Sequence, residues 1–148
     1  MKKLIIAAIM LTSIYSIAAP THYGVSEKIL KAFKETFKYA KDISWHEYQD
    51  YYQVSFQQDD IMVRAQYADD GTLLKTIRYY KEDQLRPNIV AKLKRKYAGK
   101  EIFAVTETST DEDMSYVINI KDEDNWYIVQ SDAYGNLHET DKFKRADK

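Results

Sequence analysis

The feature that most constrains the fold of this chain is an internal repeat. The segment DIMVRAQYADDGTL, residues 60 to 73, and the segment NWYIVQSDAYGNL, residues 125 to 137, share a common pattern. At a constant offset of 64, identical residues recur in four pairs: Asp60 and Asp124, Gln66 and Gln130, Gly71 and Gly135, Leu73 and Leu137. In each copy, alternation of apolar and polar residues leads into a glycine, which predicts a β-hairpin. The chain is therefore expected to contain two versions of one structural unit.

A helix is predicted at the start of each unit. The first runs through SEKILKAFKETFKYAK, with Ser26 as the N-cap, and the second runs through RPNIVAKLKRKYAGK, with Pro87 in the first turn and Gly99 as the stop. Both carry apolar residues at helical spacing, namely Ile29, Leu30, Phe33 and Phe37 in the first and Ile89, Val90, Leu93 and Tyr97 in the second. Lys28 and Lys92, and likewise Phe33 and Tyr97, stand at the same offset of 64, so helices and hairpins are expected to repeat together.

Strand-like segments follow each helix. In the first unit they cover residues 44 to 48, 51 to 57, 61 to 67 and 72 to 80, and in the second 101 to 108, 115 to 121, 125 to 131 and 136 to 143. This order predicts an α+β fold in which two tandem helix-plus-four-strand repeats form a mainly antiparallel sheet with both helices on one face. We expect one domain over residues 22 to 148, built from repeats at about 25 to 81 and 82 to 145.

The N-terminus is typical of a secretory signal. Lys2 and Lys3 precede an apolar run that Pro20 ends, and Ser16 and Ala18 suit the positions before a cleavage site. We predict a cleaved signal peptide over residues 1 to 18 and a periplasmic or secreted protein; the alternative, an uncleaved anchor, would be short for a membrane span. The chain has no cysteine, which excludes the lipoprotein route, disulfides and thiol chemistry.

Composition and motifs argue against several function classes. A net charge of −1 does not favour nucleic-acid binding, and after signal cleavage no segment would insert stably in a membrane. The histidines at 22, 46 and 138 fit no metal-ligand spacing, and the 4 glycines form no phosphate-binding loop. We predict no enzyme activity and no cofactor.

Two kinds of charged segment leave alternatives open. Acidic runs at 111 to 113 and 122 to 124 could bind calcium, although solvated turns explain them more simply. A basic block on the second helix could meet anionic lipid, although the exposed back of a helix usually has this composition; it comprises Lys92, Lys94, Arg95, Lys96 and Lys100.

Strand alternation places an unusually apolar set of residues on the sheet face away from the helices. If Val54, Phe56 and Val63 are in the core, neighbours of the opposite parity point outward. Aromatic residues, Met and Arg are the types enriched at protein interfaces. The predicted partner-binding face comprises Tyr51, Met62, Arg64, Leu74, Arg78, Tyr80, Val117, Trp126 and Ile128. A bulge that shifts one strand's parity, or a sheet curved enough to bury these side chains, is the alternative.

The chain also resembles a known family over about residues 25 to 145, in both units. The residues that carry the resemblance are Leu85, Pro87 and Val90 before Tyr97, Ile102, the acidic turn at Asp113, Tyr116 and Ile118 on a strand, and Ser131 to Gly135 before Asn136. Together they are similar to the PepSY-like repeats of secreted Bacteroidetes proteins, which are described as beta-lactamase-inhibitor-like. The sequence departs from that pattern at Ser131, where the family more often has an aromatic residue, and matches only loosely around Arg86 to Asn88.

The resemblance implies two helices backing a curved sheet whose open face grips a partner protein; no inhibitory residue transfers by position. The leading hypothesis is therefore an exported, non-enzymatic binding module with an unidentified protein partner. A periplasmic small-ligand or glycan binder that uses the same aromatic face is the alternative, and an enzyme on a similar sheet comes third.

Overall fold

Eight strands in chain order make up the sheet of the computed structural model, which describes residues 24 to 146. The two helices and eight strands follow the predicted order: α1 Glu27–Thr36, β1 Lys41–Glu47, β2 Tyr52–Gln58, β3 Ile61–Tyr67, β4 Leu73–Tyr80, η1 Glu82–Gln84 (a short 3-10 turn), α2 Pro87–Lys96, β5 Glu101–Ser109, β6 Met114–Lys121, β7 Asn125–Asp132 and β8 Leu137–Lys144. The predicted α+β class with two helix-plus-four-strand repeats is confirmed. The predicted signal peptide lies outside the described residues.

Each strand pairs antiparallel with the next along the chain, so short turns connect almost the whole sheet. Asp59 and Asp60 both have positive φ, at 50° and 61°, and close the two-residue turn between β2 and β3. Gly71 has φ of 88° in the β3–β4 turn, as its sequence position predicted, and Gly135 has φ of 78° in the equivalent β7–β8 turn. The β3–β4 and β7–β8 turns therefore lie at the two glycines from which the sequence predicted them.

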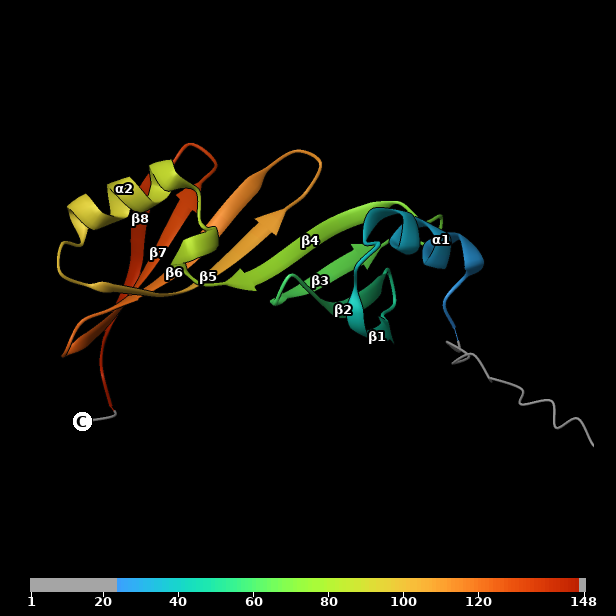
Figure 1. Ribbon diagram of the computed structural model, residues 1–148, viewed down its shortest axis with the longest axis horizontal. Coiled ribbons are helices and arrows are strands. Elements are labelled where there is room, and N and C mark those ends of the chain that lie inside the picture. The colour runs from blue at the N-terminus through green and yellow to red at the C-terminus, as the bar shows by residue number, and fades with distance from the viewer. Residues whose placement is uncertain (1–23, 147–148) are drawn as a thin grey trace, which may run out of the picture.

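Both helices cover the same side of the sheet, and Figure 1 shows them above an arched ribbon. Ile29 and Phe33 of α1 and Ile89 and Leu93 of α2 are buried there against the inner face of the strands. The Phe33 ring meets the Phe56 ring edge-on at a centroid distance of 5.2 Å. The inner faces of β6 and β7 complete this core, because Tyr116, Ile118, Ile120, Tyr127 and Val129 are all buried. The apolar core therefore lies between the helices and one face of the sheet. No described residue forms a covering layer on the other face, here called the outer face.

The first helix is shorter than predicted. It begins as expected, where the Ser26 hydroxyl accepts a hydrogen bond from the Ile29 amide at 3.4 Å, but it ends at Thr36 instead of continuing to Lys41. Phe37 leaves the helix and packs on Phe56 at a ring-centroid distance of 4.7 Å. Burial of this aromatic ring accompanies the end of the helix, and Lys41 already belongs to β1.

The two units are not related by one offset throughout. Each helix has ten residues with its third and seventh buried, Ile29 and Phe33 in α1 and Ile89 and Leu93 in α2, which corresponds to an offset of 60. From β3 onward the offset is 64, because the β5–β6 hairpin is longer than the β1–β2 hairpin. The expectation that helices and hairpins share the offset of 64 is therefore wrong for the helices. Four residues are about one helical turn, so either offset places apolar residues on the same helix face.

Strands β4 and β5 join the two units across a buried polar group. Glu107 of β5 is 7% exposed and accepts a hydrogen bond from the Tyr80 hydroxyl at 2.6 Å. The Arg78 guanidinium lies 3.1 Å from the other carboxylate oxygen of Glu107. Burial, together with this hydrogen bond to Glu107, raises the pKa of Tyr80 above its usual value. Both donors come from β4, so the carboxylate ties the end of the first unit to the second.

Candidate functional site

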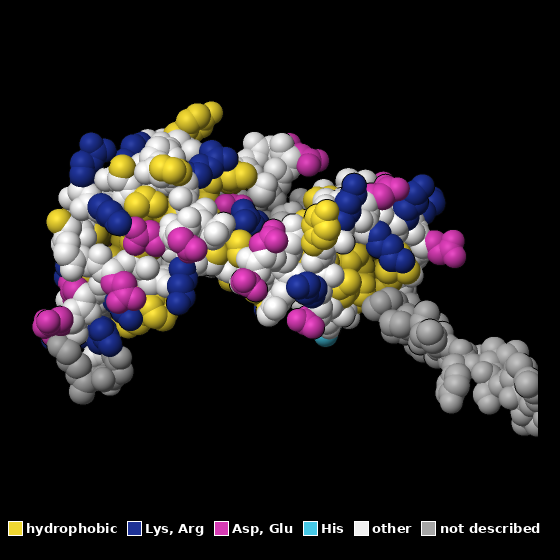
Figure 2. All heavy atoms as spheres, viewed as in Figure 1, with side chains coloured by type: hydrophobic (Ala, Val, Ile, Leu, Met, Phe, Trp, Pro, Cys, Tyr) yellow, Lys and Arg dark blue, Asp and Glu magenta, His cyan; other side chains and the backbone are white. Residues whose placement is uncertain are grey.

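The outer face presents a continuous row of side chains across seven neighbouring strands, β2 to β8. Residues directly opposite one another in the ladder share a face, and one row passes through Gln57, Met62, Tyr79, Thr106, Val117, Gln130 and His138. Met62 is 43% exposed and Val117 is 37% exposed. No helix covers this row among the described residues, and Figure 2 shows the molecule hollowed on the side opposite the helices. In the described chain, this sheet face is open to solvent and exposes apolar side chains among polar ones, a composition that often marks a binding surface.

Most of the predicted face residues occupy outward positions. The cross-strand register places Met62 and Arg64 on β3, Val117 on β6, and Trp126 and Ile128 on β7 with side chains on the outer face. Leu74 is 41% exposed beside them. Tyr51 precedes β2 and stacks on Tyr48 at the end of the β1–β2 hairpin, with ring centroids 4.6 Å apart. Tyr51 therefore extends from the hairpin instead of standing within the sheet.

The placement of Arg78 and Tyr80 on this face is wrong. Arg78 lies opposite the core residue Val63, and Tyr80 is 8% exposed on the helix side. The cause is an irregularity in the ladder, where Gln66 pairs with Lys75 but Tyr67 pairs with Leu73, so Leu74 is an extra residue. A bulge of this kind reverses the side-chain parity of the strand beyond it.

Ile77 and Tyr79 occupy the outward positions that had been assigned to Arg78 and Tyr80. The Arg64 guanidinium lies 5.3 Å from the Tyr79 ring centroid, and its Nη1 donates a hydrogen bond to the Tyr79 hydroxyl at 3.3 Å. Together with Met62 and Lys75, these residues form what we call the β3–β4 patch: Met62, Arg64, Lys75, Ile77 and Tyr79. No local signal in the sequence identified Ile77 and Tyr79, because their direction depends on the bulge.

A second group of aromatic residues lies at the far end of the same face. The Phe103 and Trp126 rings meet edge-on at 5.0 Å, and Phe143 is the cross-strand partner of Trp126. We call Phe103, Trp126 and Phe143 the aromatic cluster; Phe103 is 45% exposed and Phe143 is 54% exposed. The Lys121 ammonium lies 4.3 Å from the Phe103 ring centroid. A second irregularity, between Ile102 and Ala104, leaves Phe103 as the unpaired residue of β5, so strand alternation alone could not place it.

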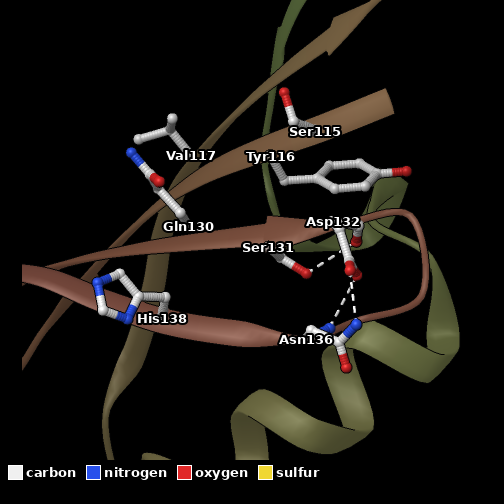
Figure 3. A pocket seen from close by; sticks show the side chains of 8 residues that line it. All are labelled: Ser115, Tyr116, Val117, Gln130, Ser131, Asp132, Asn136 and His138. Atoms are coloured by element: carbon white, nitrogen blue, oxygen red, sulfur yellow. Dashed lines mark hydrogen bonds between the residues drawn. The ribbon is translucent and has the colours of Figure 1, made fainter. Parts of the chain in front are cut away.

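A pocket of about 350 Å³ indents the sheet at the β6–β8 end of the outer-face row and includes three of its residues, Val117, Gln130 and His138. Figure 3 shows Val117, Gln130 and His138 together at one end, and Asp132 hydrogen-bonded to Asn136 at the other. Asp132 also accepts hydrogen bonds from the Asn136 and Tyr134 amides. The backbone and side-chain hydrogen bonds from Asn136 lower the pKa of Asp132 below its usual value. Because Asp132 is already engaged in the turn, the pocket contains no carboxylate poised for acid–base chemistry.

The acidic run at 122 to 124 has a structural role that explains its charge. Asp122 accepts hydrogen bonds from the Lys100 ammonium at 2.5 Å and from the Tyr127 hydroxyl at 2.8 Å. The bonds from Lys100 and then Tyr127 lower the pKa of Asp122. No group of three or more possible metal ligands occurs within residues 24 to 146. Asp122 therefore stabilises the β6–β7 turn through these hydrogen bonds.

Most of the basic block on the second helix is also engaged internally. The Lys92 ammonium donates hydrogen bonds to the carbonyl oxygens of Tyr134 and Gly135, at 2.9 and 3.0 Å. Lys94 forms an ion pair with Glu82. Lys96 lies over the Tyr97 ring, at 5.6 Å from its centroid. These contacts favour the interpretation of this block as the exposed back of a helix over that of a lipid-binding surface.

Solved structures with the same fold come from Bacteroides. A BLIP-like protein from Bacteroides fragilis matches with a TM-score of 0.65 and 17% identity over 86% of this chain and 92% of that chain. A DUF2874 family protein from Bacteroides ovatus has a TM-score of 0.62 and 17% identity, with 83% and 89% covered. A protein from Bacteroides eggerthii, named as a candidate periplasmic protein, has a TM-score of 0.61 and 14% identity, with 81% and 88% covered.

The chain has the BLIP-like fold. No protein-family model and no curated protein sequence matches it, so the likeness is one of structure alone. Within the described part of the chain, no helix is long and apolar enough to cross a membrane. The fold accounts for the two helices on one face and the arched open sheet.

Proposed function

We propose that this protein is an exported, non-enzymatic binding module that engages a protein partner through the outer face of its sheet. The observation that carries the proposal is a sheet face, uncovered among the described residues, on which Met62, Val117, Phe103 and Phe143 are exposed and Tyr79 and Trp126 are half-buried. Exposed aromatic and Met side chains next to Arg are the composition of interface hot spots. A soluble protein seldom leaves such a surface open unless a partner covers it.

Export is proposed from the N-terminal sequence, which has the basic, apolar and small-residue regions of a signal peptide over residues 1 to 18. The likeness to a Bacteroides protein named as a candidate periplasmic protein supports this location. We also assign the repeats to the PepSY-like group on the residues from Leu85 to Asn136 that resemble it. The BLIP-like fold supports the protein-binding proposal only in general terms, since it identifies no partner.

A second candidate function is the binding of a small ligand or glycan. The pocket beside Val117 favours it, since Gln130, Asn136 and His138 offer hydrogen-bonding groups beside an apolar side chain. All its lining residues come from neighbouring strands and one turn of a single sheet, so no helix closes over a bound molecule. Ligand sites usually bury most of the ligand surface, which makes the protein-binding proposal the stronger of the two.

The test is site-specific photo-crosslinking followed by quantitative binding. A photoreactive amino acid would be placed at position 117 on the outer face and, as a control, at position 31 of α1, where the Lys31 side chain is 78% exposed on a helix that covers the opposite face. Periplasmic extract of the source organism supplies the partner, which is then purified. We expect one protein to be captured from position 117 and not from position 31.

Binding of the purified partner is then measured by calorimetry for Met62→Ala and Trp126→Ala, with Lys31→Ala as the control. Truncation of a hot-spot residue is expected to weaken binding by about thirtyfold, corresponding to about 2 kcal/mol. The control should stay within about twofold of the wild type. If the purified partner binds both outer-face variants as tightly as the wild type, the outer face is not the binding surface. Quenching of Trp126 fluorescence by a small sugar, with no captured protein, would support the second candidate.

A further inference from the structure

We infer that the partner presents an acidic surface to the outer face, so that carboxylates meet the cations of the β3–β4 patch. This inference deepens the proposed function and rests on it. It is carried by the distribution of charge between the two faces and the rim of the sheet.

Carboxylates are nearly absent from the centre of the outer face. Across β2 to β6, the outward positions carry the cations Arg64, Lys75 and Lys121. The single carboxylate at an outward position of these strands is Glu101, and it forms an ion pair with Lys121 at 3.3 Å. The whole chain, by contrast, has 23 acidic and 22 basic residues. The outer face therefore has a positive centre in a protein that is almost neutral.

The acidic residues lie elsewhere. Many are in the hairpin turns at the rim of the sheet, at residues 59 to 60, 69 to 70, 111 to 113 and 122 to 124. On β7 and β8 the outward carboxylates are Asp132, which is engaged by its own turn, and Asp141 opposite Ile128. The rim would repel an acidic partner that approached off-centre, whereas the centre attracts it. Such a pattern favours one docking position.

Arg64 and Lys75 make no ion pair with any described residue. Arg64 donates to the Tyr79 hydroxyl and lies over the Tyr79 ring, which holds the guanidinium on the surface while leaving its charge uncompensated. By contrast, Arg78 on the inner face is paired with Glu107, and Lys100 is paired with Asp122. An Arg held on an aromatic ring beside exposed Met62 is suited to a carboxylate that arrives with apolar neighbours.

These features fit a protein surface better than a membrane or a nucleic acid. Anionic lipids and phosphate backbones are recognised by dense clusters of Lys and Arg. Here the three cations are separated by hydroxyl, amide and apolar side chains, including Ser55, Gln66 and Ile77. The arched sheet also offers a hollow rather than a flat or protruding surface (Figure 2). A convex, acidic protein surface with exposed apolar side chains complements both the shape and the charge.

The probe for the test is a displayed library of random peptides of about 12 residues, selected on the immobilised full mature chain. Peptides are kept for analysis only if they lose binding to Met62→Ala or Trp126→Ala. Among these face-dependent peptides, we expect the ratio of Asp and Glu to Lys and Arg to rise about threefold or more above the unselected library. The strongest acidic peptide is then synthesised for titration.

The charge reversal Arg64→Glu with Lys75→Glu should weaken that peptide by about tenfold or more. The matched control is Lys31→Glu with Arg95→Glu, which makes the same change of charge at two exposed helix positions and should stay within about twofold. Raising NaCl from about 50 to about 500 mM should weaken the wild-type complex several-fold and leave the reversed variant nearly unaffected.

The two proposals fail in different ways. If the face-dependent peptides are neutral or basic, the acidic-partner inference is overturned while the outer face remains a binding surface. If no selected peptide depends on Met62 or Trp126, the proposed function itself is refuted. If phosphatidylglycerol vesicles bind the wild type, lose binding on charge reversal, and no acidic peptide is selected, the occupant is a membrane and the inference is wrong.

Discussion

Replacement of Glu107 by Ala should test whether the buried carboxylate between β4 and β5 holds the two units together. The change removes the acceptor of the 2.6 Å bond from the Tyr80 hydroxyl and the partner of Arg78 at 3.1 Å. A buried donor left without an acceptor costs about 1 to 3 kcal/mol, and breaking a fully buried ion pair costs about 3 to 5 kcal/mol. The Arg78 side chain is 36% exposed, so water can solvate part of its charge and the second contribution must be reduced.

We therefore expect Glu107→Ala to lower the free energy of unfolding by about 3 kcal/mol, measured by urea denaturation at neutral pH. For a domain of this size, the midpoint of thermal unfolding should fall by about 10 °C. Glu107→Gln, which keeps one acceptor for Tyr80 but loses the charge facing Arg78, should give a smaller loss of about 1 to 2 kcal/mol.

The chain supplies a matched control at Glu47. Glu47 lies at the end of β1 with Tyr52 as its cross-strand neighbour, just as Glu107 has Tyr116 as its cross-strand neighbour. Unlike Glu107, it is exposed, and the hydrogen bond it accepts from the Tyr52 hydroxyl is long, at 3.5 Å. Glu47→Ala should leave the free energy of unfolding unchanged within error. Equal losses for Glu47→Ala and Glu107→Ala would refute the reasoning, because burial of the acceptor would then have no energetic consequence.

Three further predictions follow from the turns and the buried tyrosines. Gly99→Ala should lower the free energy of unfolding by about 1 kcal/mol because of its φ of 75° alone. Gly71→Ala should lower it by about 2 kcal/mol, because the added Cβ would also lie 3.3 Å from the Lys28 carbonyl oxygen. Equal losses in urea denaturation would contradict this. The pKa of Asp122 is lowered in the folded protein, so its contribution to stability is present above about pH 4 and is lost as pH falls through the folded pKa. The free energy of unfolding of Asp122→Asn should therefore fall less steeply with acid than that of the wild type. Parallel plots of this free energy against pH would count against the role of Asp122. Burial raises the pKa of Tyr67 to about 12, against a smaller lowering effect of the Thr36 side chain, and no described residue forms a hydrogen bond with its hydroxyl. The neutral form is therefore fully present below about pH 10, and stability falls as pH rises from there to about 12. Tyr67→Phe should match or exceed the wild type in stability at pH 7 while Tyr80→Phe loses about 1 kcal/mol, and a larger loss for Tyr67→Phe would show that its hydroxyl does have a partner.

Features that depend on neighbours along the chain could be predicted from the sequence. Ser26 caps the first helix and Pro87 begins the second, because capping and the missing proline amide act within one turn. Gly71 and Gly135 have positive φ because the turns beside them require it. Alternation in β2, β3, β6 and β7 also identified the core, since these strands run without interruption opposite one another. The α+β class, the tandem units and the outward positions of Met62, Val117 and Trp126 follow from these local patterns.

Features that depend on cross-strand register were decided only by the tertiary structure. An extra residue at Leu74 turns Arg78 and Tyr80 toward the core and brings Ile77 and Tyr79 to the outer face. A second irregularity leaves Phe103 unpaired in β5, in contact with Trp126. A shift of one residue reverses every side chain beyond it, and the bulge forms where two strands must match in length and twist, which no single segment encodes. The sequence by itself therefore determined the units and their core, whereas the pairing of strands decided which residues a partner would meet.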